Sequence, residues 1–265
     1  MDIYKYATYP TTEEVDGIYC QKKEAFKNME LQIGGKKTYG ILQGKEMEYD
    51  FWLIEYNNRI LDLINAYVLT SFYYNKGIPD ERWTSSPRPG FNVNFPDFKE
   101  EHHSYAYWFD FYLESYYTKF FGIIDTLYHL VNLKYELFIE PKPRFNAIVL
   151  KKLSEIEEEL ASKLLKENLK KDSAFETADQ YRNDLTHNYR PHQISSPMKR
   201  RKASNEDYIY DMKTGARTLA SEVRGVEIYD FSSSSYTTTK EFMKNINDSI
   251  DFLGKLILEI KDKLE

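Results

Sequence analysis

The chain has 265 residues, 42% of them hydrophobic, which is enough to build the core of one large domain or of two small ones. Its one cysteine, Cys20, excludes a disulfide framework and a cysteine-based zinc site, and fits a reducing compartment. The formal net charge of −6 means that nucleic acid would have to contact a local basic patch. The N-terminus lacks the layout of a signal peptide and no apolar run could span a membrane, so we expect a cytoplasmic protein without membrane contact.

The first third of the chain combines a mixed N-terminal extension, one helix and one loop. Residues 1–48 have no sustained period, but the sequence from Met29 to Leu42 predicts two short strands in a hairpin around its glycine pair. Apolar residues recur at three- and four-residue spacing over residues 49–75, which predicts a long helix. Residues 78–96 hold four prolines and one glycine and predict an extended loop.

Three more helices are predicted in the middle of the chain. The aromatic-rich segment from Ser104 to Ile139 is apolar all round, which favours a central position in a bundle. Residues 146–170 carry one apolar stripe and one Glu/Lys-rich face, which predicts a helix at the surface. The next helix is predicted to have Ser173 as its N-cap, in capping-box spacing to Glu176, and to end before Pro191.

The C-terminal part is predicted to be an insertion followed by a final helix. Residues 191–237 are irregular except for two β-like runs, Asp207–Tyr210 and Val226–Phe231, and we interpret them as an insertion. The last helix is predicted over Thr239–Leu264. Together the elements predict an all-α fold: a bundle of about five helices over residues 49–265, with a short β-like N-terminal extension and a loop-rich insertion before the last helix.

The predicted helix that begins at Ser173 carries the residue types best suited to chemistry. Arg182 offers a planar, permanently charged fork that matches phosphate oxygens, and His187 can give or take a proton near neutral pH. Together they are a minimal set for cleaving a phosphodiester bond without a metal. They belong to a predicted polar face that consists of Glu176, Asp179, Arg182, Asn183, Thr186, His187 and Arg190.

The sequence RNDLTHNY, from Arg182 to Tyr189, resembles the R-x4-6-H signature of HEPN (higher eukaryotes and prokaryotes nucleotide-binding) domains. In detail it is similar to the R-x4-H-x-Y form of HEPN toxins, with Asn183 at the polar position that often follows the arginine. The resemblance implies a bundle of four to five helices, which covers roughly residues 49–264. It does not account for the N-terminal extension or for the insertion.

The resemblance also implies a metal-independent endoribonuclease that needs no cofactor and works as a homodimer. Arg182 would bind the scissile phosphate, and His187 would act as general acid or base while the ribose 2′-hydroxyl attacks phosphorus. Asn183 would assist in orientation. Because the reaction uses the 2′-hydroxyl, RNA and not DNA would be the substrate. His187 lies in the last helical turn, where the negative end of the helix dipole favours positive charge.

Several other residues receive supporting roles. In toxin–antitoxin pairs of the HEPN family, a nucleotidyltransferase partner adds AMP to the motif tyrosine, which here is Tyr189. Acidic residues near the site, Asp125, Asp179 and Glu176, are weaker candidates for support. The dense basic cluster suits contact with an RNA backbone, or else forms a solvated loop. It consists of Arg190, Lys199, Arg200, Arg201 and Lys202.

Three functions therefore remain open from the sequence. The first is an endoribonuclease in stress response, phage defence or a toxin system. The second is a catalytically inactive HEPN bundle that binds a nucleotide or assembles with proteins. The third is a purely structural helical protein in which the motif is a coincidence. A metal site is not expected, because a di-iron bundle needs two Glu-x-x-His motifs and the chain has one, Glu100 to His103.

Overall fold

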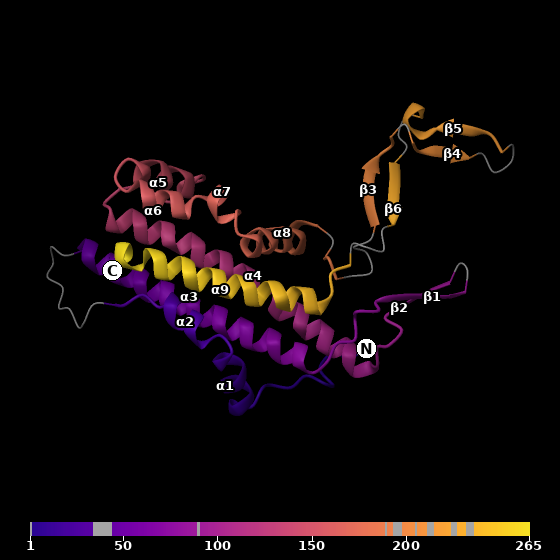
Figure 1. Ribbon diagram of the computed structural model, residues 1–265, viewed down its shortest axis with the longest axis horizontal. Helices are drawn as coiled ribbons and strands as arrows, with labels where there is room; N and C mark the ends of the chain where they lie inside the picture. The colour runs from indigo at the N-terminus through magenta and orange to yellow at the C-terminus, as the bar shows by residue number, and fades with distance from the viewer. Residues whose placement is uncertain are drawn as a thin grey trace. The chain divides into compact units, whose positions relative to one another are not determined.

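The computed structural model describes residues 2–33, 44–88, 91–188, 190–192, 198–204, 206–210, 215–223, 227–231 and 236–265 (Figure 1). They group into two compact units. The first consists of Met1–Asn183 together with Thr239–Glu265, and the second consists of Asp184–Thr238. The first unit is a helical bundle, which confirms the predicted all-α fold.

Two long helices form the centre of the first unit. They are α3 (Gly44–Asn75) and α4 (Glu100–Lys134), and they run antiparallel. At one end the ring of Trp52 stacks on that of His129, and at the other Tyr73 stacks on Trp108. The helix predicted over 49–75 is confirmed. The aromatic helix predicted over 104–139 is shifted toward the N-terminus, because the left-handed backbone of Glu136 (φ 49°) and Phe138 (φ 55°) cannot continue a helix.

The last helix, α9 (Thr239–Leu264), packs on α3, α4 and α6, and its bounds agree with the prediction. Its apolar stripe is buried from Phe242 to Leu264. Its N-terminus is held by the buried carboxylate of Asp80, which accepts the backbone N–H (2.7 Å) and the hydroxyl (2.9 Å) of Thr239. Since the first N–H groups of a helix have no partner within it, Asp80 serves as a cap supplied from elsewhere in the chain.

The N-terminal extension contains two helices, α1 (Thr12–Cys20) and α2 (Lys23–Met29). Helix α2 packs on α9, where Gly254 allows close approach: a Cβ built there would lie 3.0 Å from the Cα and the carbonyl oxygen of Ala25. The predicted hairpin from Met29 to Leu42 falls largely outside the described residues. Where it is described, Met29 is the last residue of α2 and residues 30–33 form no regular element.

The core contains tyrosines whose rings are buried and whose hydroxyls bond to other elements. Tyr56 donates to the carbonyl of Met29 (2.9 Å), and Tyr128 donates to that of Leu164 (2.9 Å). Tyr117 donates to the amide oxygen of Asn245 in α9 (2.8 Å). Because a buried hydroxyl without a partner is costly, each of these bonds fixes how one element sits against the next.

The predictions for residues 146–170 and 78–96 are wrong. The helix predicted over 146–170 is three shorter helices: α5 (Phe145–Ser154), α6 (Glu158–Leu164) and α7 (Lys166–Leu169). The break between α5 and α6 contains several glutamates within five residues, and their mutual repulsion disfavours a continuous helix. Their negative charge is favourable at the N-terminus of α6. The loop predicted over 78–96 contains an antiparallel pair, β1 (Thr84–Arg88) and β2 (Phe91–Asn94). Pro87 is tolerated in β1 because a two-stranded ribbon leaves outward N–H groups unused.

The described residues of the second unit include two antiparallel strand pairs. Strand β3 (Met198–Lys202) pairs with β6 (Glu227–Phe231), and β4 (Tyr208–Tyr210) pairs with β5 (Arg217–Leu219), which leads into a 3-10 turn. The two predicted β-like runs are confirmed as β4 and β6. The basic run from Met198 to Lys202, read as a solvated loop in one interpretation, is strand β3 instead. No described helix combines the length and the apolar character that crossing a membrane requires.

Candidate functional site

Helix α8 (Ser173–His187) carries all three predicted catalytic residues, Arg182, Asn183 and His187. The predicted cap is wrong by one residue: the carboxylate of Asp172 accepts the N–H of Ala174 (2.8 Å), so Asp172 caps the helix and Ser173 is its first residue. An aspartate is at least as good a cap as serine, and its charge adds a favourable interaction with the helix dipole.

Aromatic contacts fix α8 against α4 and α9. The ring of Phe175 is buried and lies 5.5 Å from the rings of both Phe121 in α4 and Phe252 in α9. One and a half turns later, Tyr181 lies 4.5 Å from the ring of Phe242 in α9. These contacts hold α8 to two elements of the bundle, so its polar side has a defined direction.

Arg182 is exposed, and its guanidinium carbon lies 5.1 Å from the centroid of the Phe121 ring. This cation–π contact with α4 restricts the direction of a long and flexible side chain. A guanidinium that stacks through its flat face still directs its N–H groups outward in the plane, where they match the oxygens of a phosphate. Arg182 is therefore an exposed cation with a restrained position.

Asp179, one turn before Arg182, lies in a setting that the sequence did not predict. Its side chain is 2% exposed rather than part of a solvated polar face, and its two oxygens accept from Lys166 (2.9 Å) and Lys170 (2.8 Å). Burial alone would raise the pKa of this carboxyl, but the hydrogen bonds from Lys170 and Lys166 outweigh burial and hold the pKa below its usual value. Asp179 thus joins α8 to α7, while Glu176 remains exposed.

His187 is exposed in the last turn of α8, and Asn183 is half-buried. At about 100° per residue, Asn183 and His187 lie about 40° apart on the helix and share one ridge. Arg182 and His187 lie about 140° apart on the same helix. The helix therefore places Arg182 and His187 on different sides. The predicted polar face thus covers more than one side of α8.

The supporting residues are spread over several elements. Asp125 is exposed on α4 one turn after Phe121, and it accepts the amide of Asn146 in α5 (2.9 Å). Arg190 is half-buried after the end of α8, and Tyr189 lies outside the described residues. The basic residues Lys199, Arg200, Arg201 and Lys202 form most of β3; Lys202 is exposed, and the side chains of the other three lie outside the described part of the structure.

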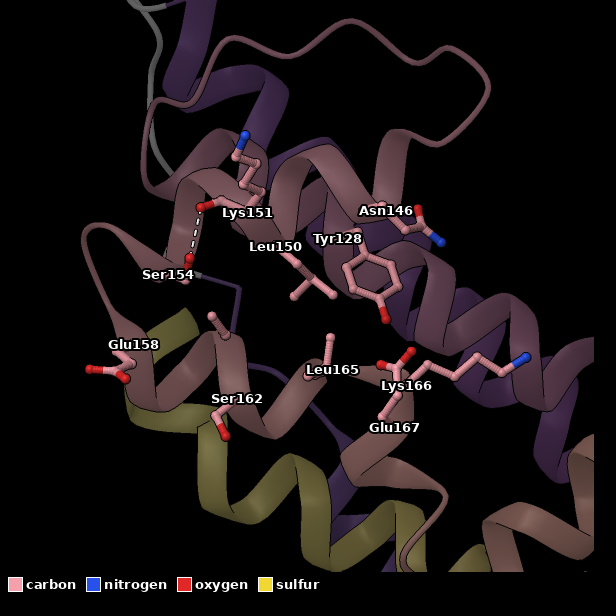
Figure 2. Close-up of a pocket in the computed structure, with 12 residues that line it drawn as sticks. Tyr128, Asn146, Leu150, Lys151, Ser154, Glu158, Ser162, Leu165, Lys166 and Glu167 are labelled. Atoms are coloured by element: carbon pink, nitrogen blue, oxygen red, sulfur yellow. Dashed lines mark hydrogen bonds between the residues drawn. The ribbon is translucent and has the colours of Figure 1, made fainter.

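A pocket with a volume of about 590 Å³ lies between α4, α5, α6 and α7 (Figure 2). Tyr128, Leu150 and Leu165 direct their side chains into it, and Lys166, the partner of Asp179, is part of its wall. Sequence reasoning missed this site because its apolar residues have the same spacing as core residues. Among the described residues, no group of three or more His, Cys, Asp or Glu side chains could hold a metal ion.

Comparison with known proteins gives one match. The model of the HEPN_Cthe2314-like HEPN family matches residues 52–247, which is well over half of the chain. The matched part extends from α3 to the first turns of α9 and includes the whole R-x4-H motif of α8. No curated protein and no solved structure matches the chain. Because the match covers well over half of the chain, the chain belongs to the HEPN_Cthe2314-like family of the HEPN superfamily.

Proposed function

We propose that the protein is a metal-independent endoribonuclease whose site includes Arg182 and His187. HEPN domains are in general a nuclease and RNA-binding fold, which supports this class of function. The observation that carries the proposal is the exposed arginine and histidine at R-x4-H spacing on α8, with the arginine restrained over Phe121. A cation of restrained position and a neighbouring proton-transfer group are what the cleavage of a phosphodiester bond requires.

In the proposed reaction the ribose 2′-hydroxyl loses its proton to a base, and its oxygen forms a bond to the adjacent phosphorus. The bond between phosphorus and the 5′-oxygen breaks, and that oxygen takes up a proton. The products are a 2′,3′-cyclic phosphate and a 5′-hydroxyl, so atoms and protons balance without a metal. Arg182 stabilises the negative charge that accumulates on the phosphoryl oxygens, and His187 transfers one of the two protons.

The angle of about 140° between Arg182 and His187 on α8 favours a site composed of two copies of the chain. If the α8 helices of two copies lie side by side, the arginine of one copy and the histidine of the other can converge on one phosphate. HEPN domains commonly dimerise, which supports a homodimer. Asn183 shares the ridge of His187 and would orient the histidine or the substrate.

The proposed biological setting is stress response, phage defence or a toxin system. The basic strand β3 and Arg190 would supply contacts to the RNA backbone, which a chain with net charge −6 needs locally. A nucleotidyltransferase-type antitoxin that modifies Tyr189 would regulate such a toxin. Each of these roles depends on the ribonuclease activity and is tested after it.

The test is RNA cleavage in buffer that contains EDTA. We expect Arg182→Ala and His187→Ala each to lower the cleavage rate at least about a hundredfold, with an unchanged circular dichroism spectrum. Gln180→Ala is the matched control, because Gln180 is exposed on the same helix and has no predicted role in the site, and this variant should keep the wild-type rate.

A second candidate function is an inactive HEPN bundle that binds a nucleotide or assembles with other proteins. It is favoured by the spacing of the two residues on α8: at about 100° per residue Arg182 and His187 lie about 140° apart, so one copy of the helix does not present both to the same phosphate. If the wild-type protein cuts no RNA at high concentration, or if both alanine variants cut as fast as the wild type, the ribonuclease proposal is wrong and the second function is favoured.

A further inference from the structure

The pocket between α4, α5, α6 and α7, called the α4–α7 pocket below, has the size and lining of a site for a small planar ligand. Its volume of about 590 Å³ falls within the range of pockets that enclose small molecules. Tyr128, Leu150 and Leu165 supply an apolar interior, as Figure 2 shows. Apolar walls combined with few polar groups suit the face of a ring system, since a face has no hydrogen bonds to satisfy.

Polar groups stand at the edges of this apolar interior. Asn146 lines the pocket and is held by its hydrogen bond to Asp125, so its amide has a fixed orientation. In Figure 2 the side chain of Lys151 extends upward at one edge of the pocket, and that of Lys166 extends to the right at another. An amide can read the donors and acceptors on the edge of a nucleobase, and two lysines at separate edges suit the phosphates before and after one nucleotide.

Helix α4 connects the pocket to the arginine of the proposed site. Phe121, which holds Arg182, and Tyr128, which lines the pocket, are seven residues apart on one side of α4, with Asp125 between them. The rise of α4 between these two residues is about 10 Å. At the spacing of stacked bases this distance corresponds to about three nucleotides, and to fewer in an extended strand.

A second connection passes through α7 and α8. Lys166 lines the pocket and bonds to Asp179, which precedes Arg182 by one helical turn. The pocket and the arginine are therefore parts of one packed assembly within the first unit. An RNA strand bound at Arg182 would have to advance about 10 Å along α4 for one of its next bases to enter the pocket.

We propose that the α4–α7 pocket binds one base of the RNA substrate, within about three nucleotides of the cleaved phosphate. This inference rests on the proposed ribonuclease function and adds a subsite that selects where the RNA is cut. The base lies against Tyr128 and Leu150, its edge meets Asn146, and the neighbouring phosphates meet Lys151 and Lys166.

The first experiment measures binding without cleavage. The probes are homohexamers of A, C, G and U with 2′-O-methyl riboses, which cannot react by 2′-hydroxyl attack. Ala147→Trp places a large ring in the pocket from an exposed position of α5, and Ser154→Trp does so from the end of the same helix. Ile148→Trp is the matched control, since Ile148 is exposed beside Ala147 and does not line the pocket.

We expect at least one homohexamer to bind the wild type and the Ile148→Trp variant equally, and both pocket variants about tenfold more weakly. Circular dichroism and thermal melting establish that each variant folds. If no homohexamer binds the wild type, or if the pocket variants bind as well as the control, the base subsite is wrong. The second result would leave the pocket to another occupant, such as an apolar side chain of a partner protein.

The second experiment separates this inference from the proposed function. An RNA library of random sequence is cut by the wild type and the variants, and the cut ends are sequenced. A base preference at one position near the cut, flattened by Ala147→Trp but kept by Ile148→Trp, supports the subsite. Cutting with an unchanged preference in Ala147→Trp refutes the subsite and leaves the ribonuclease intact. Absence of cutting refutes the ribonuclease, and the binding experiment then decides whether the pocket holds a base.

Discussion

Replacement of Asp179 by asparagine should show how strongly the buried carboxylate holds α8 to α7. The change removes the negative charge but keeps the size of the side chain. Two charge-assisted hydrogen bonds, from Lys166 at 2.9 Å and Lys170 at 2.8 Å, are lost or weakened. Bonds to charged groups contribute about 1.5–3 kcal/mol each, but the two lysine side chains are 52% and 41% exposed and regain water. We therefore expect Asp179→Asn to lower the free energy of unfolding by about 2 kcal/mol.

The effect should depend on pH in a defined direction. The pKa of Asp179 in the folded protein lies below the usual value of 3.8, because the lysine hydrogen bonds outweigh the effect of burial. The stabilisation is then complete above pH 3.8 and is lost as the pH falls below it through the folded-state pKa. Wild type and Asp179→Asn should differ by a constant amount from about pH 8 to pH 5 and approach each other toward about pH 3.

Urea denaturation followed by circular dichroism, at several pH values, measures this difference, and thermal melting should show a loss of about 6 °C at neutral pH. Glu176→Gln on the exposed side of α8 is the control and should change stability by less than about 0.5 kcal/mol. If Asp179→Asn is no more destabilising than Glu176→Gln, or if its effect is the same at pH 3 and pH 7, the reasoning about the ion pairs is refuted.

Two further predictions concern the packing of α9. Asp80→Ala removes the acceptor of the N–H and of the hydroxyl of the buried Thr239. The free energy of unfolding, measured in urea, should therefore fall by about 2 kcal/mol, and a fall of less than about 0.5 kcal/mol would contradict the capping role. Gly254→Ala places a Cβ 3.0 Å from the backbone of Ala25, so thermal melting should show that the protein is less stable by about 1–3 kcal/mol. The control is Gly17→Ala in α1, where a Cβ has no atom within 4 Å and should make the protein more stable by up to about 1 kcal/mol. Equal melting temperatures of the two variants would argue against close contact between α2 and α9.

The sequence predicts elements well where one physical signal extends over several turns. The apolar stripe of α9 recurs from Phe242 to Leu264, and its predicted bounds agree with the structure. Between Phe145 and Leu169 a similar stripe continues across two breaks, because the same spacing of apolar residues suits one long helix or three short ones that pack on different neighbours. Periodicity shows which residues are buried but not whether the axis of the helix stays straight.

The candidate site was predictable only in part. The position of Arg182 and His187 on one helix follows from the sequence, because caps and Pro191 mark the ends of that helix. The burial of Asp179 does not follow, since its lysine partners come from a separate helix whose placement depends on tertiary packing. Phe121 could not be assigned to Arg182 either, because nothing in an aromatic-rich segment distinguishes the one ring that meets the guanidinium.

The hydroxyl groups in the core set an alkaline limit on the fold. Burial raises the pKa of Tyr128 to about 12 and raises those of Tyr56 and Tyr117 further, whereas tyrosines in the unfolded chain ionise near 10.0. Since the folded-state values lie above the unfolded one, the stability that these tyrosines contribute is complete below pH 10 and is lost progressively above it. Ionisation of these rings therefore has to accompany unfolding. Phenolate absorbance that appears together with the loss of helical circular dichroism, after the exposed tyrosines have ionised, would then report the opening of the bundle with no label attached.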